Sequence, residues 1–399
     1  LVGLYDPWRD LYSKTNPRGV PFKNFLITDP VRQQIPWRKL AIDQLKQGRL
    51  PKWNPYSFSG TPLLANIQAA VFYPFNVLFF IFDFATAWTI LVILEPLLAG
   101  IFLYLYLRHL RLDPWACLLG SIVWAFSGFN VSWLTWGTMG HVILWLPVIL
   151  LAIDKIFAAQ GIRPEKQLWK WGIVFIFALV AQFFAGHIQI SLYVIFVTVF
   201  YLAWRLRRNL IQQKQPNVVI KKFYCLTAGL VIVLLVTSVQ WLPLIKLVWE
   251  SSRIEEVSWL KNGWFLPLSH LIQFIVPDFF GNPTTLNYWG EWNYGEFIGY
   301  IGVIPLIFAL LGLLTKENKE KSFWIWSLLV SFIFIFANPI SRFIFIFRIP
   351  LISALQPTRL MVIIDFSLAV FSAFGFNSLI KGTKRNIWGI IAVVFLAFL

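Results

Sequence analysis

Apolar runs of roughly 20 residues recur along the whole chain, and this feature constrains the fold more than any other. An α-helix rises about 1.5 Å per residue, so each run is long enough to cross a hydrocarbon core about 30 Å thick. Only 13% of the 399 residues are charged, against about 25% in soluble domains. The sequence therefore predicts an all-α integral membrane protein whose outward-facing loops carry short interfacial helices.

We expect about ten transmembrane helices, each an apolar run bounded by polar or turn-forming residues. The chain starts at Leu1 without a methionine and stops at Leu399 inside an apolar run, so we expect it to be truncated at both ends. The predicted spans cover residues 88–107, 115–134, 141–158, 171–185, 188–204, 223–248, 298–314, 322–337, 360–380 and 387–399.

The loops between these spans alternate in their content of Lys and Arg. By the positive-inside rule, the set rich in Lys and Arg is cytoplasmic. The other set faces outward: it comprises the polar region 1–87 and the loops 249–297 and 338–359 of the transmembrane domain 88–399. The basic residues are spread over short loops and form no stripe, so the net charge of +16 does not indicate nucleic acid binding.

The polar region 1–87 contains no clear span. Asp29 followed by Pro30 predicts a helix that runs to about Gln47. Residues 69–84 are apolar but interrupted by proline, asparagine and aspartate, which favours an interfacial or re-entrant segment. Similar segments are expected where the two outer loops read LPLSHLIQFIVPDFFGNP and FIFIFRIPLISALQPTR.

Signatures of soluble enzymes are absent from the sequence. There is no Walker loop, no HExxH, no CxxC and no dinucleotide-binding glycine run. Cys117 and Cys225 lie in or beside apolar runs and indicate neither a disulfide framework nor a metal site. No tight carboxylate pair such as Asp-x-Asp is present, so we predict no firm metal site and no certain cofactor. A divalent metal ion stays open as an alternative source of positive charge.

Several strings in the chain carry a resemblance. They are TDPVRQQIPW at 28–37, GRLPKWNPYSFSGTPLLANIQAAVFYPFN at 48–76, AGHIQISLY at 185–193, PDFFG at 277–281 and LQPTR at 355–359. Together they resemble the YfhO-like family of bacterial membrane proteins. That family is similar in plan to the GT-C type of membrane glycosyltransferase, which uses polyprenyl-phosphate sugars. The resemblance implies a first outer loop with a catalytic acidic residue, usually preceded by one more membrane helix.

Asp29 is the acidic residue that matches this pattern. In an inverting glycosyl transfer, a carboxylate takes the proton from the acceptor hydroxyl as its oxygen attacks the anomeric carbon. An Asp directly before Pro30 is equally suited to cap a helix N-terminus, and this structural use stays open. Asp6 and Asp10 are fallback candidates that are more easily explained as solvated residues.

The leaving group of such a reaction is a lipid phosphate, which needs positive charge nearby. Basic residues close to Asp29 in sequence, and one in the late outer loop, are the candidates for this role, because an Arg fork binds two phosphate oxygens at once. Contact with anionic lipid headgroups is the alternative use for each of them except Arg359. The candidates are Arg32, Arg38, Lys39, Lys52 and Arg359.

Amides and one histidine are the candidates for binding sugar hydroxyls. Asn66 and Gln68 match the family string together with Gly60, although loop shaping and helix capping are equal alternatives. His187 and Gln189 lie in a tight outer turn between two spans, where polar side chains must find partners or water.

Other polar and aromatic residues have less specific interpretations. His141 begins a predicted span and fits simple interfacial placement. Glu95 and Asp365 fall within spans, where an ionisable group is costly and indicates either function or a buried structural contact. An aromatic belt at the membrane interface is expected from Trp53, Trp133, Trp136, Trp145 and Trp264.

The resulting hypothesis is an enzyme of the bacterial cytoplasmic membrane with its N-terminal loop outside. It would transfer a sugar from a polyprenyl-phosphate donor in the bilayer to an extracytoplasmic acceptor, such as an envelope polymer or a glycolipid. The alternative is a lipid or glycan transporter, or flippase, without bond chemistry. Most polar residues gather outside the predicted spans, which weighs against transport. A scaffold for envelope assembly is a third interpretation.

Overall fold

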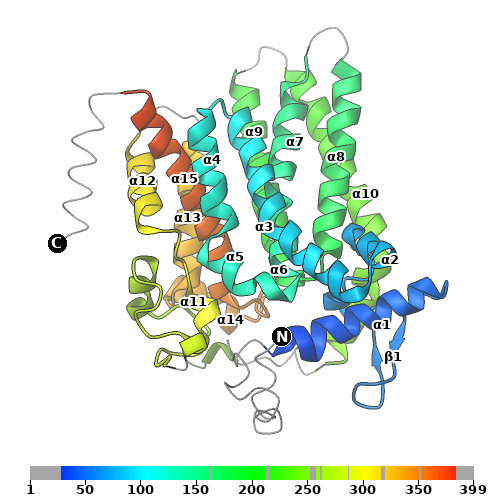
Figure 1. Ribbon diagram of the computed structural model, residues 1–399. Coiled ribbons are helices and arrows are strands. Elements are labelled where there is room, and N and C mark those ends of the chain that lie inside the picture. Colours follow the sequence, from blue (N-terminus) through cyan, green and yellow to red (C-terminus); the bar gives the residue numbers. More distant parts are fainter. Residues whose placement is uncertain are drawn as a thin grey trace.

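A computed structural model describes residues 28–160, 164–212, 216–251, 258–260, 263–285, 287–315, 320–349 and 352–382. The described part is a helical bundle with a layer of short helices and loops at one end (Figure 1). Asp6, Asp10 and the predicted span 387–399 lie outside the described residues.

Almost all regular structure is helical, with one hairpin of two short strands paired antiparallel. The elements are η2 (Pro30–Gln34), α1 (Ile35–Lys46), β1 (Trp53–Asn54), β2 (Thr61–Pro62), η3 (Ile67–Ala69), η4 (Pro74–Val77), α2 (Leu78–Ile81), α3 (Phe84–His109), α4 (Pro114–Ala125), α5 (Gly128–Trp133), η5 (Leu134–Trp136), α6 (Met139–Ile143), α7 (Leu146–Ala158), α8 (Pro164–Phe184), α9 (Ile188–Gln212), α10 (Pro216–Trp249), η7 (Ser258–Leu260), η8 (Leu268–Phe274), η9 (Pro283–Thr285), α11 (Tyr294–Phe297), α12 (Val303–Leu314), α13 (Lys321–Ile335), α14 (Pro339–Ile346), η10 (Pro357–Leu360) and α15 (Met361–Ile380).

Within the described ranges, six helices are long and apolar enough to cross a membrane. They are α3, α6 continued by α7, α8, α9, α10, and η10 continued by α15. Two bent pairs, α4 with α5 and η5 (41°) and α13 with α14 (65°), raise the number to eight if each pair is one span. The predicted membrane fold is confirmed, whereas α12 has only 12 residues and the count of ten stays a prediction.

Close packing of α12 against α15 anchors the C-terminal half of the bundle. A Cβ on Gly312 would lie 2.1 Å from the carbonyl oxygen of Phe371, and one on Gly375 would lie 1.9 Å from that of Phe308. Only glycine permits this approach, which is how membrane helices gain packing contacts without a hydrophobic driving force.

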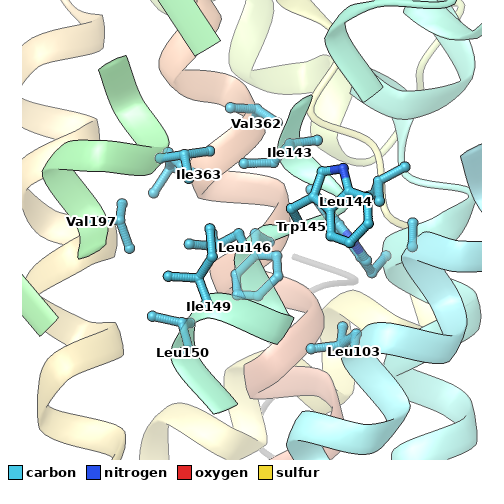
Figure 2. Packing of buried hydrophobic residues seen from close by; sticks show 14 of the residues in the cluster. Leu103, Ile143, Leu144, Trp145, Leu146, Ile149, Leu150, Val197, Val362 and Ile363 are labelled. Atoms are coloured by element: carbon cyan, nitrogen blue, oxygen red, sulfur yellow. The ribbon is translucent and has the colours of Figure 1, made fainter. Parts of the chain in front are cut away.

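The main hydrophobic core runs through the middle of the bundle. Figure 2 shows side chains from four elements meeting there: Leu103 from α3, Leu146 and Ile149 from α7, Val197 from α9 and Ile363 from α15. All five are less than a tenth exposed. The core therefore joins helices that lie far apart in sequence.

The predicted helix from Asp29 to about Gln47 is confirmed, with the π-turn η2 followed by α1. Gly48, which follows it, adopts a φ of +69°, a conformation in which a glycine ends a helix at little cost. Figure 1 shows α1, α2, the β1 strand, α5, α11 and α14 at one end of the bundle. All of these except α5, which falls in the predicted span 115–134, belong to segments predicted to face outward; the side of the membrane on which they lie stays a prediction.

A buried polar cluster ties together the opposite end of the bundle. Arg205 of α9 pairs with Asp154 of α7 at 2.5 Å and with Glu320 at 3.1 Å. Tyr201 donates to Asp154 at 2.9 Å, and Arg208 pairs with Glu320 at 2.7 Å. Four charged side chains from three segments therefore fix the ends of these helices.

Candidate functional site

An ion pair between α11 and η10 is the centre of the candidate site. Arg359, in η10, lies against Glu296 of α11: its Nη2 is 3.2 Å and its Nε 3.3 Å from the same carboxylate oxygen, Oε1. The neighbouring Thr358 donates to Oε2 at 3.1 Å. The Glu296 side chain is 4% exposed and that of Arg359 is 22% exposed. The pair therefore joins the loop before α12 to the start of α15.

The turn before α9 supplies the other partners of this arginine. Nη1 of Arg359 donates to Oε1 of Gln189 at 3.1 Å and lies 3.4 Å from Nε2 of His187. Gln189 in turn donates to the carbonyl of Gln356 at 2.6 Å. The structure thus brings together three of the residues singled out from sequence. Their remaining contacts include Glu296 for Arg359, Tyr193 and Gln356 for Gln189, and the backbone N–H of Ile190 for His187.

A pocket of about 390 Å³ lies next to this ion pair. Its lining comes from residues 126–136, 277–284 and 293–300. Trp133 belongs to the lining, and the guanidinium of Arg359 lies 5.8 Å from the centroid of the Trp133 ring. Gly295 of the lining directly precedes Glu296. The ion pair therefore lies directly beside two residues of the pocket lining, Trp133 and Gly295.

Asp29 lies at the N-terminal end of η2 and is half-buried. Its Oδ1 is 3.4 Å from Nε2 of Gln33, and its side chain makes no capping hydrogen bond. The turn η2 packs against η5, and Trp136 of η5 lines the pocket. Asp29 itself does not line the pocket. The neighbouring turn η2 contacts η5, which contributes Trp136 to the lining.

Arg38 is fully buried. It donates to the carbonyl of Gly137 at 3.2 Å, and its guanidinium lies 5.5 Å from the ring centroid of Trp88. Burial lowers the pKa of Arg38 to about 10, so it keeps its charge at neutral pH. Its contacts attach α1 to the turn after η5. Of the other predicted cations, Arg32 and Lys52 are exposed.

The amides of the N-terminal string have structural contacts. Asn66 accepts from the backbone N–H of Gln68 at 3.2 Å and so caps η3. Gln68 accepts from Gln34 of η2 at 2.8 Å. Gly60 has a φ of +119°, and a Cβ there would lie 2.3 Å from the ring of Trp53. The structure therefore shows the two structural alternatives predicted from sequence. Asn66 caps a helix, and Gly60 shapes a loop.

The two acidic residues within spans are both buried. Oδ2 of Asp365 accepts from the backbone N–H of Phe129 at 3.1 Å and so holds the start of α5. Glu95 lies 3.8 Å from Nε2 of His141, and a Cβ on Gly140 would meet its carboxylate. His141 is fully buried and bonds Tyr73 at 2.9 Å. Its predicted interfacial placement is therefore wrong, because it lies inside the protein.

The predicted aromatic belt is wrong for most of its members. Trp133, Trp136, Trp145 and Trp264 are each less than a tenth exposed, and only Trp53, at 51%, is open to its surroundings. Protein side chains, not the membrane interface, cover these rings.

Glu296 and Asp278 are the residues that sequence reasoning does not single out. Both lie among several acidic residues of the loop 249–297, and nothing in their spacing marks them. The one usable signal is that Asp278 falls within the PDFFG string. As for metals, no three His, Cys, Asp or Glu side chains of the described part of the chain lie together in a way that could hold an ion.

The fold and the site together define a multi-pass α-helical membrane protein with a pocket built by its loops at one end of the bundle. Residues 66–399 match the model of a family described as bacterial membrane protein YfhO, and the chain belongs to this family. The predicted family is thereby confirmed over residues 66–399, whereas the string at 28–37, which contains Asp29, lies before the matched residues. No curated protein and no solved structure matches the chain.

Proposed function

We propose that this protein is a membrane glycosyltransferase of the bacterial cytoplasmic membrane that takes its sugar from a polyprenyl-phosphate carrier. The observation that carries the proposal is the packing of η2, which directly follows Asp29, against η5, whose Trp136 lines a pocket at one end of the apolar bundle. The pocket volume is within the range of about 300–1,000 Å³ typical of small-ligand sites. Exposed apolar helix surfaces offer the prenyl chain a lateral approach from the lipid.

In the proposed reaction, the acceptor hydroxyl oxygen forms a bond to the anomeric carbon of the donor sugar. The bond from that carbon to the phosphate oxygen breaks, and its electron pair leaves with the polyprenyl phosphate. The proton of the acceptor hydroxyl passes to the carboxylate of Asp29. The anomeric configuration inverts, because attack and departure occur on opposite faces.

Cations have two roles in this proposal. Arg32 and Lys52 are exposed and free to meet the phosphate of a lipid donor at the surface. Arg38 and Arg359 act as positioning residues: the first fixes η5 through Gly137, and the second holds Trp133 and Glu296. Asn66, Gln68, His187 and Gln189 maintain the surrounding loops.

The experiment uses the full chain in lipid nanodiscs with a radiolabelled polyprenyl-phosphate hexose and a crude envelope acceptor fraction. Asp29→Asn is expected to abolish transfer, because the amide cannot accept the proton. The matched control is Asp43→Asn on the adjacent helix α1, where the carboxylate pairs with Lys39 at 2.8 Å on the surface. Full activity of Asp29→Asn would remove this residue from the mechanism, and an equal loss in both variants would point to folding.

A second function, lipid transport without bond chemistry, is favoured by one observation. Glu95 is 2% exposed within α3, and neither of its oxygens has a hydrogen-bond partner among the described residues. An ionisable group in a span whose oxygens receive no hydrogen bond is costly and typical of transport pathways. Proteoliposomes that move a labelled prenyl lipid without changing its mass, and lose this with Glu95→Gln, would establish transport instead.

A further inference from the structure

The pocket carries its own information about the chemistry of its occupant. Within the described residues, its lining includes one carboxylate, from Asp278, but no Lys, Arg or His. Arg359, whose guanidinium lies over the ring of the lining residue Trp133, is already paired with Glu296. A phosphate placed in this pocket would therefore face a negative group without a compensating cation. Among the described residues, the lining therefore favours a neutral ligand over an anionic one.

Asp278 presents one free oxygen at this pocket. Its Oδ1 accepts from the hydroxyl of Tyr294 at 2.6 Å and from the amide of Asn282 at 3.0 Å. Oδ2 receives no hydrogen bond from any residue that the structure describes, and Asp278 is exposed. Burial, together with the hydrogen bond to Asp278, raises the pKa of Tyr294. The phenol therefore stays a donor, and the carboxylate is held in one orientation.

Another part of the lining is aromatic. Trp133 and Trp136 both belong to the lining, with ring centroids 4.7 Å apart and planes tilted by 63°. Asn293 adds an amide to the polar wall. An ionised acceptor facing large apolar rings suits a ligand with hydroxyl groups on one side and C–H groups on the other. A neutral carbohydrate ring has this composition.

We propose that this pocket binds the carbohydrate acceptor, with a sugar hydroxyl donating to Oδ2 of Asp278 and the ring lying against the parts of Trp133 and Trp136 that line the pocket. The acceptor extends from the pocket past η5, against which η2 packs, so that its reacting hydroxyl meets Asp29. This inference rests on the proposed glycosyl transfer and assigns the acceptor, not the lipid phosphate, to the pocket. The acceptor class is a neutral glycoside. The phosphate of the donor remains outside the pocket, near the exposed cations of the N-terminal region.

Binding is tested without transfer, by titrating the full chain in nanodiscs with methyl glycosides and following tryptophan fluorescence. A panel of methyl glucoside, galactoside, mannoside and N-acetylglucosaminide is compared with inorganic phosphate and glucose 1-phosphate. At least one neutral glycoside is expected to bind saturably, and at least tenfold more tightly than glucose 1-phosphate. Asp278→Asn is expected to weaken that binding about tenfold, because a charge-assisted hydrogen bond is lost.

A second variant keeps the test independent of this carboxylate. A Cβ on Gly295 would lie 3.6 Å from Cβ of Ser132, so Gly295→Leu fills the pocket from α11, while Asp43→Asn serves as the surface control. Thermal melting confirms that each variant is folded. The proposal is overturned if no glycoside binds, if phosphate binds as tightly, or if folded Asp278→Asn and Gly295→Leu bind like the control.

The transfer assay separates this proposal from the function on which it rests. If transfer occurs, Asp278→Asn is expected to raise the KM for the acceptor about tenfold and to leave the KM for the lipid donor unchanged. An unchanged acceptor KM would refute the pocket assignment and leave the glycosyltransferase standing. Saturable glycoside binding in a protein with no transfer activity would support the pocket assignment and refute the glycosyltransferase.

Discussion

The ion pair behind the pocket gives the sharpest test of the site's architecture. Nη2 of Arg359 and Oε1 of Glu296 are 3.2 Å apart. At an effective dielectric constant of about 20, two unit charges at this distance attract by about 5 kcal/mol. The Glu296 side chain is 4% exposed, but that of Arg359 is 22% exposed. Solvent screening and desolvation therefore offset more than half of the attraction, and we expect a coupling free energy of about 2 kcal/mol.

A double-mutant cycle measures this coupling in the full chain. The free energy of unfolding in mixed micelles is compared for Glu296→Ala, Arg359→Ala and the double variant. The matched control is the cycle on Lys39 and Asp43, which are 2.8 Å apart but 56% and 45% exposed. That pair should couple by about 0.5 kcal/mol or less. A coupling at Arg359 no larger than the control's would show that the pair does not hold the pocket wall.

Three further predictions concern the support of the loop end. Gly128→Ala would place a Cβ 2.2 Å from Cγ2 of Ile298 and should lower the free energy of unfolding by about 1–3 kcal/mol, whereas Gly172→Ala, with nothing within 4 Å, should not destabilise the protein. Asp365→Ala leaves a buried N–H of α5 without its acceptor and should cost about 1–3 kcal/mol in the same measurement. Burial lowers the pKa of His270, so the unfolded chain binds the extra proton and stability should decrease as pH falls below about 6.5. His270→Phe should flatten that dependence of the melting temperature on pH.

The membrane fold could be predicted from sequence because the solvent imposes it. A run of apolar residues long enough to cross the bilayer has almost no alternative to a helix, since every backbone group must be satisfied internally. The bounds of α3 and α9 therefore follow the predicted spans 88–107 and 188–204. The bend between α4 and α5 could not be predicted from sequence, because the break at Phe126–Ser127 lies inside a mostly apolar run.

The candidate site could be predicted only in part, since its members come from distant segments. Arg359, Gln189 and His187 were found because motif strings and a tight outer turn point to them, and they do meet. Glu296 was not found, because it is 63 positions away from its partner in a loop with several other acidic residues. Pairing across such separations depends on how the bundle folds, which local pattern does not encode.

Arg38 shows the same limit in the opposite direction. Its sequence neighbours resemble those of an exposed helical cation, yet it is fully buried. What determines this is the packing of the N-terminal segment on the turn after η5, where the Gly137 carbonyl and the Trp88 ring receive its charge. Its charge and its closeness to Asp29 in sequence predict a phosphate ligand or contact with a lipid headgroup. The structure instead shows protein groups filling that need.

Polar clusters at both ends of α9 explain how the bundle supports an exposed pocket. Apolar contacts between helices gain little over contacts with lipid, so polar bonds and close packing must set how the helices align. Gln189 joins Arg359 at the loop end, and Arg205 joins Asp154 and Glu320 at the other end. The two positions on α9 are roughly 25 Å apart along its axis. Because α9 is held by polar contacts near both ends, its position along the bundle is fixed. The end that carries Gln189 therefore holds Arg359, and with it the lining residue Trp133, in place.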